Sequence, residues 1–347
     1  MNDEGRRKLA KLNSPHCHGD KIALWRSKDV THYCGFQNIG AAMTVLSYTT
    51  VDVFTSNRFE GNPLAVVTGA EQLSTKTMQK IAAEFKYSEI TFVLPPKDPT
   101  NTANVRIFTP TMEVPFAGHP NVGTAYVLGQ QREIFGRPIG DTLRFEEKAG
   151  LVEVALRRTE GRVTAATIRA PRPLDIGTAV CEETIARCIG IDRSAIFKST
   201  HQPVFVSVGL TFAVAELDGL ASLGAARPNL THFQEAAGPN AESNHDFSLF
   251  VYVRSPDEPW TIRARMFAPL DNVAEDPATG SASAALCAYL VSLAPEQTMS
   301  RRVTIEQGVE MGRRSIIDVD VIKKDGVVTD VTISGSCVPV MRGEITV

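Results

Sequence analysis

A short pattern that occurs twice constrains the fold of this chain most strongly. Residues 116–128 read FAGHPNVGTAYVL, and residues 275–286 read EDPATGSASAAL. Both contain Pro-x-x-Gly-[Thr/Ser]-Ala, and both follow an Arg-x-Phe-x-Pro segment, at residues 106–110 and 265–269. Two spaced matches of this kind predict a duplicated unit of roughly 150 residues. We therefore expect two related halves rather than two unrelated domains.

Each copy of the pattern has the features of a helix start. An ionisable residue, His119 in the first copy and Asp276 at the same place in the second, is followed by small residues that open an apolar helix. A helix start leaves backbone N–H groups unpaired, and its dipole favours negative charge. Gly and Ser are also ordinary caps, so a single copy would be weak support for a binding site. Two such starts facing each other would bind a carboxylate from both sides.

Composition excludes several classes of protein. An apolar content of 43%, a charged content of 22% and a net charge of -3 describe an ordinary globular chain. Basic residues are neither in excess nor clustered, which argues against nucleic acid or an anionic membrane as a partner. No run of about 18 apolar residues exists, so we expect no transmembrane helix. Six irregularly spaced cysteines do not form a disulfide scaffold and indicate a reducing, cytoplasmic setting.

Three segments are expected along the chain. Residues 1–46 form an N-terminal extension without sustained periodicity, which we expect to be either poorly ordered or loosely docked. Residues 47–170 form the first half, and residues 171–347 form the second half, with closing strands that are free to cross back to the first. The extension contains residue types that bind metals, but their spacing matches no standard zinc pattern, so we expect no metal site. These residues are His16, Cys17, His18, His32 and Cys34.

The periodicity of apolar residues predicts a β-rich unit around one helix in each half. The central helices, which we expect to start near Pro120 and near Gly280, are apolar on nearly every side, so each must be surrounded by protein. A curled sheet wrapped around each helix is the natural solution. Other helices are expected over 75–85 and 182–189. Strands are expected at 50–54, 64–67, 88–94, 103–108, 143–145, 151–156, 163–169, 204–208, 211–217, 248–253, 303–307, 316–322, 327–334 and 338–347.

Three ionisable residues are candidates for proton transfer. Glu89 lies at the head of the apolar strand in YSEITFVLP, where burial would raise its pKa towards neutrality. The alternative is an exposed strand-end glutamate that binds a backbone donor. His119 titrates near neutrality unless its surroundings shift it, although it could simply cap the helix. Asp276 is favoured before a helix by about 0.3–1 kcal/mol, and such capping does not exclude contact with a ligand.

Nucleotide and hydrolase motifs are absent from the sequence. There is no Gly-x-Gly-x-x-Gly that opens a strand-turn-helix, no Walker loop and no Gly-x-Ser-x-Gly elbow. The remaining groups require no cofactor. Carboxylates and an imidazole around a paired anion site suit proton abstraction and return at carbon.

Taken together, these motifs resemble the PhzF-like family of phenazine biosynthesis. The resemblance runs from about Thr50 to Val347 and is carried by VDVFTSNRFEGNPLAVV, YSEITFVLP, FAGHPNVGTAYVL, EDPATGSASAAL, EQGVEMGR and ISGSCVPVMRGEI. It implies an α+β fold of the diaminopimelate epimerase type. In this fold, two pseudo-symmetric halves each wrap a β-barrel-like sheet around a central apolar helix, and the site lies in the cleft between them. The resemblance also implies a homodimer.

The resemblance assigns roles to residues of this chain. In the characterised isomerase of the family, which acts on trans-2,3-dihydro-3-hydroxyanthranilate, the glutamate of the S-E-x-T-F motif is the acid/base, and this implies the same role for Glu89. His119 and Asp276 would orient polar substituents of the substrate. Substrate binding would involve Ser88, Gly118, Gly280 and Ser281. Asn121 departs from the family pattern, which more often has Thr there, so the shape of the pocket can differ.

The function that we expect is a cofactor-independent isomerase acting on a small carboxylate-bearing molecule. Epimerases of this fold use two cysteines at the helix starts, and His119 and Asp276 occupy those places here, which disfavours a two-thiol racemase. Two alternatives stay open. One is a non-catalytic member of the family that binds a metabolite or a protein partner through the same cleft. The other is a racemase or epimerase that uses two bases on opposite faces of one carbon.

Overall fold

The computed structural model describes residues 44–238, 247–255 and 257–347. Most of the predicted extension, residues 1–43, lies outside the described residues, and so does its group of histidines and cysteines. Within the described ranges, no helix is both long and apolar enough to cross a membrane.

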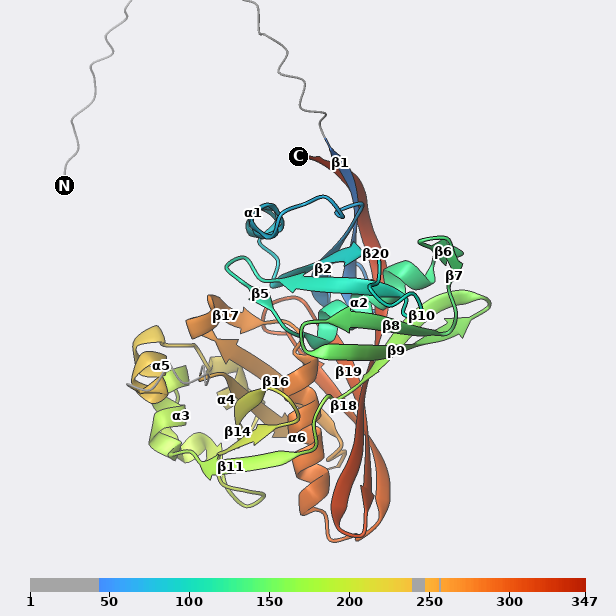
Figure 1. Cartoon of the computed structure of the whole chain (residues 1–347). Helices are drawn as coiled ribbons and strands as arrows, with labels where there is room; N and C mark the ends of the chain where they lie inside the picture. Colours follow the sequence, from blue (N-terminus) through green and yellow to red (C-terminus); the bar gives the residue numbers. More distant parts are fainter. Residues whose placement is uncertain (1–43, 239–246, 256) are drawn as a thin grey trace, which may run out of the picture. The chain divides into compact units, whose positions relative to one another are not determined.

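The first half is a ring of strands that closes around one helix (Figure 1). Each neighbouring pair in the order β1, β2, β3, β4, β8, β9, β10, β20 is hydrogen-bonded, and β20 pairs again with β1. Closure leaves no free edge in this sheet. The elements are β1 (Val45–Val53), β2 (Asn62–Thr68), α1 (Thr75–Phe85), β3 (Glu89–Leu94), β4 (Ala103–Phe108), β5 (Glu113–Val114), α2 (Gly118–Gly129), β6 (Glu133–Ile134), β7 (Arg137–Pro138), β8 (Thr142–Glu147), β9 (Gly150–Thr159) and β10 (Arg162–Arg169).

Helix α2 fills the interior of this ring. All of its residues are buried, and it contacts β1, β2, β3, β9, β10 and β20. A helix without a polar face needs such an enclosure. The helix begins at Gly118, two residues before Pro120, in agreement with the predicted start near Pro120. Pro120 lies in the first turn, where a missing N–H leaves no hydrogen bond unmade.

The second half also wraps strands around α6, through the pairing order β11, β13, β14, β15, β16, β18, β19, β20. Helix α6 contacts β13, β14, β18, β19 and β20, and its apolar residues belong to the same core as those of α2. The elements are β11 (Asp175–Ala179), α3 (Glu182–Ile189), η1 (Arg193–Ala195), β12 (Ile196–Phe197), β13 (Val204–Ser207), β14 (Thr211–Leu217), α4 (Leu220–Ala225), α5 (Leu230–Ala237), β15 (Leu249–Arg254), β16 (Thr261–Ala268), η2 (Pro269–Asp271), β17 (Val273–Asp276), α6 (Gly280–Leu293), β18 (Met299–Gln307), β19 (Ser315–Lys324) and β20 (Val327–Thr346).

Strand β20 joins the two halves of one continuous sheet. It pairs with β19 in the second half and with β10 and β1 in the first, and Figure 1 shows it running beside β1. The prediction of two separate strands here was wrong. Gly335 lies within β20, and the ring of Phe54 packs against it so closely that a Cβ would lie 2.1 Å from Phe54 Cδ1, so only glycine fits there. Pro339, which cannot donate a hydrogen bond, is opposite a register shift between Thr50 and Val51.

The two copies of the repeated pattern do not occupy equivalent places. Gly123 lies in the middle of α2, where a Cβ would meet Val53 and Leu64, whereas Gly280 is the first residue of α6. The glycine that corresponds to Gly280 by position is Gly118, the first residue of α2. His119 therefore lies inside a helix, while Asp276 ends strand β17. The prediction that His119 and Asp276 hold the same place in the two halves was wrong.

Candidate active site

The starts of the two buried helices lie against each other. A Cβ placed on Gly118 would be 3.7 Å from the backbone nitrogen of Ser281 and 3.8 Å from Gly280 Cα. The residues before the two helices, Ala117 and Thr279, do not cap them through their own side chains. Unpaired N–H groups of both helices thus face one small region, and both helix dipoles favour an anion in it.

Asn62, the first residue of β2, links the two halves beside these helix starts. Its Nδ2 donates to Asp276 Oδ1 over 2.8 Å and to the carbonyl of Ala278 over 3.1 Å. The same nitrogen lies 3.4 Å from His119 Nδ1. Its Oδ1 accepts from Ser88 Oγ over 3.3 Å. One buried amide therefore fixes an acid from the second half against an imidazole from the first.

The loop before α6 is held in place by Gln307, at the end of β18. Its Nε2 donates to the carbonyl of Asp276 over 2.7 Å, and its Oε1 accepts from the backbone N–H of Thr279 over 3.0 Å. The carboxylate of Asp276 also accepts from the hydroxyls of Thr279 and Ser88. Burial raises the pKa of Asp276 to about 6, and the donors Thr279, Asn62 and Ser88 limit that rise. At neutral pH Asp276 is therefore mostly ionised.

Glu89 and His119 meet on the other side of Asn62. Glu89 Oε2 lies 3.6 Å from His119 Nδ1. Burial raises the pKa of Glu89 to about 8, with smaller contributions from the negative charges of Asp276 and Asp271. Burial also lowers the pKa of His119 to about 3. At neutral pH the site therefore holds a protonated Glu89, a neutral His119 and an ionised Asp276.

Two acids with separated pKa values can take different roles in one reaction. Glu89 is near the pH range in which a group both accepts and returns a proton efficiently, whereas Asp276 keeps its charge. His119 Nε2 is buried and has no hydrogen-bond partner among the described residues. A buried polar atom without a partner is unfavourable unless a ligand or water satisfies it, so His119 has capacity for one further contact.

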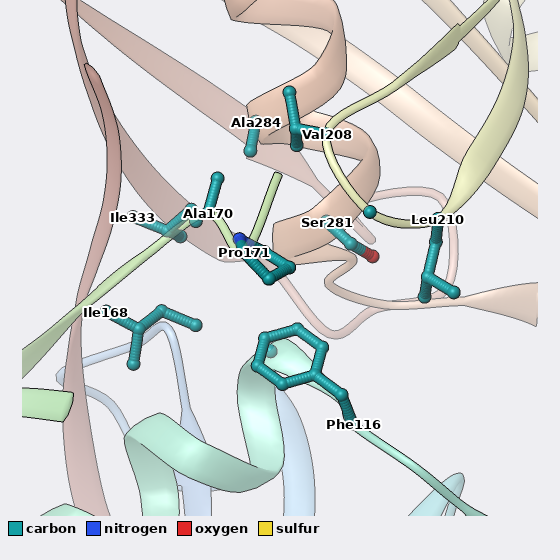
Figure 2. Close-up of a pocket in the computed structure, with 11 residues that line it drawn as sticks. Phe116, Ile168, Ala170, Pro171, Val208, Leu210, Ser281, Ala284 and Ile333 are labelled. Atoms are coloured by element: carbon teal, nitrogen blue, oxygen red, sulfur yellow. The ribbon is translucent and has the colours of Figure 1, made fainter. Parts of the chain in front are cut away.

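An apolar pocket adjoins the two helix starts (Figure 2). Gly118 and Ser281 contribute to its wall, and Figure 2 shows the Ser281 hydroxyl near the side chains of Phe116, Pro171 and Leu210. Ser281 supplies the only side-chain hydroxyl among the lining residues. The acid cluster of Glu89, His119 and Asp276 is not part of this pocket. The helix starts therefore have acids on one flank and apolar side chains on the other.

The structure brings the predicted site residues into one region. Ser88, Glu89, His119 and Asp276 surround Asn62, while Gly118, Gly280 and Ser281 form the adjacent helix starts. Sequence reasoning missed Asn62, Thr279 and Gln307 as members of the site. The signals for two of them were present, since Asn62 follows a turn in EGNP and Gln307 ends a strand in EQG.

Comparison with known proteins places the chain in a family. Residues 51–343 match the family described as phenazine biosynthesis-like protein. An uncharacterised isomerase of Mesorhizobium japonicum, mll1393, is 35% identical over 87% of this chain and 99% of its own length. The trans-2,3-dihydro-3-hydroxyanthranilate isomerase of Pseudomonas chlororaphis is 34% identical over 86% of this chain and 98% of its own. The chain belongs to the phenazine biosynthesis-like, PhzF-type family.

A solved structure confirms the fold class. The crystal structure of a PhzF-family protein from Bacillus anthracis matches with a TM-score of 0.76 at 24% identity, covering 88% of this chain and 100% of the other. The predicted α+β fold of the diaminopimelate epimerase type is thus confirmed. The predicted enzyme class, isomerase, is confirmed by the named relatives.

Proposed function

We propose that this chain is a cofactor-independent isomerase that moves a proton on a small carboxylate-bearing substrate, with Glu89 as the general acid/base. One observation carries the proposal above all others. The side chain of Glu89 is 20% exposed and lies 3.6 Å from His119, and its pKa of about 8 is far above its ordinary value of 4.5, first because of burial and then because of the negative charge of Asp276. A structural glutamate at a strand end would instead have a donor that stabilises its charge.

The proposed reaction is a balanced proton shift. Ionised Glu89 accepts a proton from an sp³ carbon of the substrate, and the electron pair of the broken C–H bond moves into the neighbouring unsaturated system. The neutral Glu89 carboxyl then returns the proton to a different carbon of that system. Nothing is oxidised or reduced overall, and the enzyme ends in its starting state. A pKa near the working pH suits both halves of this exchange.

The other site residues would bind and orient the substrate. The unpaired N–H groups at Gly118, Gly280 and Ser281 would bind its carboxylate, and the Ser281 hydroxyl adds a donor. His119 Nε2 has no partner of its own and would contact a polar substituent. The carboxylate of Asp276 accepts hydrogen bonds from Ser88 and Asn62, which hold it in place. It would accept a further hydrogen bond from a hydroxyl or amino group of the substrate.

The substrate class follows from the same arrangement. An anion site next to an apolar pocket suits a carboxylate on a small hydrocarbon ring or chain. The relative from Pseudomonas chlororaphis is named for trans-2,3-dihydro-3-hydroxyanthranilate, which has this composition. We include this compound and similar unsaturated cyclic acids in the proposed class. A cytoplasmic homodimer is part of the proposal, and the described cysteines 181, 188, 287 and 337 are all free thiols in keeping with that compartment.

Incubation with trans-2,3-dihydro-3-hydroxyanthranilate and a panel of related unsaturated carboxylic acids tests the proposal. Proton NMR in H₂O and D₂O would follow the position of the double bonds. The proposal predicts a shifted double-bond system, with solvent deuterium at the carbon that receives the proton. Binding of panel compounds without any isomerisation or exchange would instead favour a binding protein built on the same cleft.

A further inference from the structure

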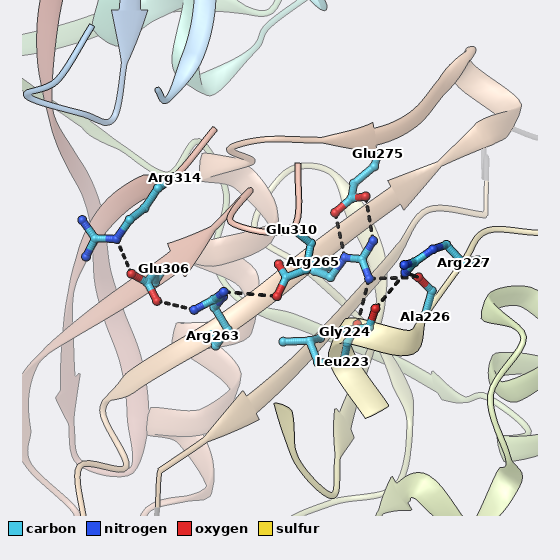
Figure 3. A network of polar contacts seen from close by, with 10 residues as sticks. All are labelled: Leu223, Gly224, Ala226, Arg227, Arg263, Arg265, Glu275, Glu306, Glu310 and Arg314. Carbon is cyan, nitrogen blue, oxygen red and sulfur yellow. Dashed lines mark hydrogen bonds and ion pairs between the residues drawn. The ribbon is translucent and has the colours of Figure 1, made fainter. Parts of the chain in front are cut away.

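Arg265, from the Arg-x-Phe-x-Pro segment before the second motif, makes a buried clamp near the site (Figure 3). Its Nε and Nη2 donate to the two carboxylate oxygens of Glu275, each over 2.8 Å. Nη1 donates to the carbonyls of Leu223 and Ala226, at the end of α4, over 2.8 and 2.9 Å. The side chain of Arg265 is 3% exposed, and its guanidinium lies 4.9 Å from the ring centre of Phe267.

The first half contains the counterpart of this clamp. Arg106 Nε and Nη2 donate to the two carboxylate oxygens of Glu113 over 2.8 and 2.7 Å, and its guanidinium lies 5.1 Å from the ring centre of Phe108. Nη2 also donates to Thr75, at the start of α1. In both halves an arginine thus joins a peripheral helix to the short strand that leads to a buried helix. The same arginine–glutamate contact occurs in both halves of the duplicated fold, which distinguishes it from an isolated surface ion pair.

The clamp on Glu275 bears directly on the next residue. Glu275 and Asp276 are consecutive in β17, where neighbouring side chains point to opposite faces. Asp276 pairs in register with Met266, the residue that follows Arg265. The two hydrogen bonds to Glu275 on one face of the strand therefore fix the rotation of the strand about its axis. The same rotation sets the direction in which Asp276 points on the opposite face. That direction is the one in which Asn62 and Thr279 reach the Asp276 carboxylate.

We propose that Arg265 is a positioning residue of the site, which acts through the Glu275 fork to hold Asp276 in reach of its hydrogen-bond donors. This inference rests on the proposed function in one respect only, which is the role of Asp276 in binding the substrate. The geometry itself concerns the protein without substrate. A bidentate arginine fork defines an orientation that a lysine ammonium, with the same charge, cannot define.

The pKa of Asp276 is the readout, because it depends on the donors that the clamp keeps in place. The ionisable groups that face Asp276 are Glu89 from β3, His119 from α2 and Glu275 on its own strand. Arg265→Lys and Glu275→Asp both conserve the charges around Asp276. The first removes the two-point contact, and the second draws the carboxylate away from the guanidinium by one methylene. A purely electrostatic role of Arg265 therefore predicts no change in either variant.

The experiment is a carbon-13 NMR titration of side-chain carboxyl carbons, with the Asp276 signal assigned from its loss in Asp276→Asn. We expect the pKa of Asp276 to rise by about one unit or more in Arg265→Lys, since loss of a hydrogen bond to a charged group has that effect. Glu275→Asp is expected to shift the pKa of Asp276 in the same direction. This second variant provides the test if Arg265→Lys does not fold. An unchanged pKa of Asp276 in the variants that fold would overturn the proposal.

Arg302→Lys is the matched control. Arg302 also makes a two-point contact, with Asp320 across β18 and β19, but its side chain is 58% exposed. Its replacement should leave the titration of Asp276 unchanged, and an equal shift there would overturn the proposal. No substrate or turnover enters this measurement. A shift without isomerisation would refute the proposed function alone, and isomerisation without a shift would refute the positioning role alone.

Discussion

His119 Nδ1 lies 3.6 Å from Glu89 Oε2, yet neither group carries a charge at neutral pH. A histidine next to a glutamate usually forms an ion pair that lowers the pKa of the acid. Here burial dominates and moves the two pKa values in the opposite sense, to about 8 for Glu89 and about 3 for His119. At neutral pH the proton is therefore mostly on the Glu89 carboxyl, and the proposed reaction starts from the smaller fraction of the protein in which Glu89 is ionised.

The first prediction concerns pH. Glu89 must be ionised to accept a proton from carbon, so kcat/KM for solvent deuterium exchange should rise with pH and level off above a midpoint of about 8. The charge of Asp276 contributes to that high pKa, after burial. Asp276→Asn should therefore move the midpoint to lower pH, whatever it does to the maximal rate.

A titration of the exchange rate between pH 5 and 10 checks this prediction. Asp320→Asn is a suitable control. The carboxylate of Asp320, on β19, pairs with the exposed Arg302 on β18, so its replacement should leave the midpoint in place. A midpoint that stays the same in Asp276→Asn would mean that the two carboxyl groups do not interact as described.

The second prediction concerns stability. The pKa of Glu89 is raised from 4.5 to about 8 in the folded protein, so the folded state binds the proton more tightly than the unfolded state. This carboxyl therefore destabilises the fold progressively as the pH rises from 4.5 to 8. Glu89→Gln, which cannot ionise, should raise the free energy of unfolding by roughly 4 kcal/mol at pH 8.5 relative to its effect at pH 4.

Urea denaturation of both proteins at the two pH values measures this difference. The result expected of an active-site residue is higher stability without activity. Equal pH dependence in the native protein and in Glu89→Gln would show that the carboxyl is not shifted in the folded state.

A third prediction separates binding from folding by means of two glycines. A methyl group on Gly118 would meet its nearest neighbour, Ser281 N, at an ordinary contact distance of 3.7 Å, but it would enter the region between the helix starts. Gly118→Ala should therefore change the melting temperature little and raise KM about tenfold, equivalent to about 1.4 kcal/mol of binding. Gly335→Ala would place a methyl 2.1 Å from Phe54 Cδ1. It should destabilise the protein by about 1–3 kcal/mol.

Thermal melts and steady-state kinetics on the two variants check the contrast. If Gly118→Ala left KM unchanged in a folded protein, the helix starts would not be the carboxylate site. If Gly335→Ala left the melting temperature unchanged, the contact with Phe54 would not restrict residue 335 to glycine.

Local sequence signals were sufficient for much of the fold. Helices α1 and α3 have the predicted bounds, and Ser74 caps α1 by accepting from the backbone N–H of Thr77. The apolar sequence of α2 and α6 required an enclosing sheet, which the structure contains. These features depend on residues within one element or on its periodicity.

Other features depend on contacts between distant residues, which a local pattern does not contain. The packing of Phe54 against β20 depends on the missing side chain of Gly335, and the geometry of the site depends on Asn62 reaching Asp276, 214 residues away. The repeated pattern was real in sequence but gave the wrong structural alignment. Its Pro-x-x-Gly-[Thr/Ser]-Ala match set Gly123 opposite Gly280, although Gly118 is the glycine that opens the first helix.

The most direct test of the account is deuterium uptake from D₂O into trans-2,3-dihydro-3-hydroxyanthranilate, measured by mass spectrometry with the native chain and with Glu89→Gln. Ser88→Ala is the control, since it removes only the neighbouring hydroxyl that supports Asn62 and Asp276. We predict uptake with the native chain, a modest reduction in Ser88→Ala, and a loss of about 10³-fold or more in Glu89→Gln. Uptake that persists at the native rate in Glu89→Gln would contradict the assignment of Glu89 as the acid/base.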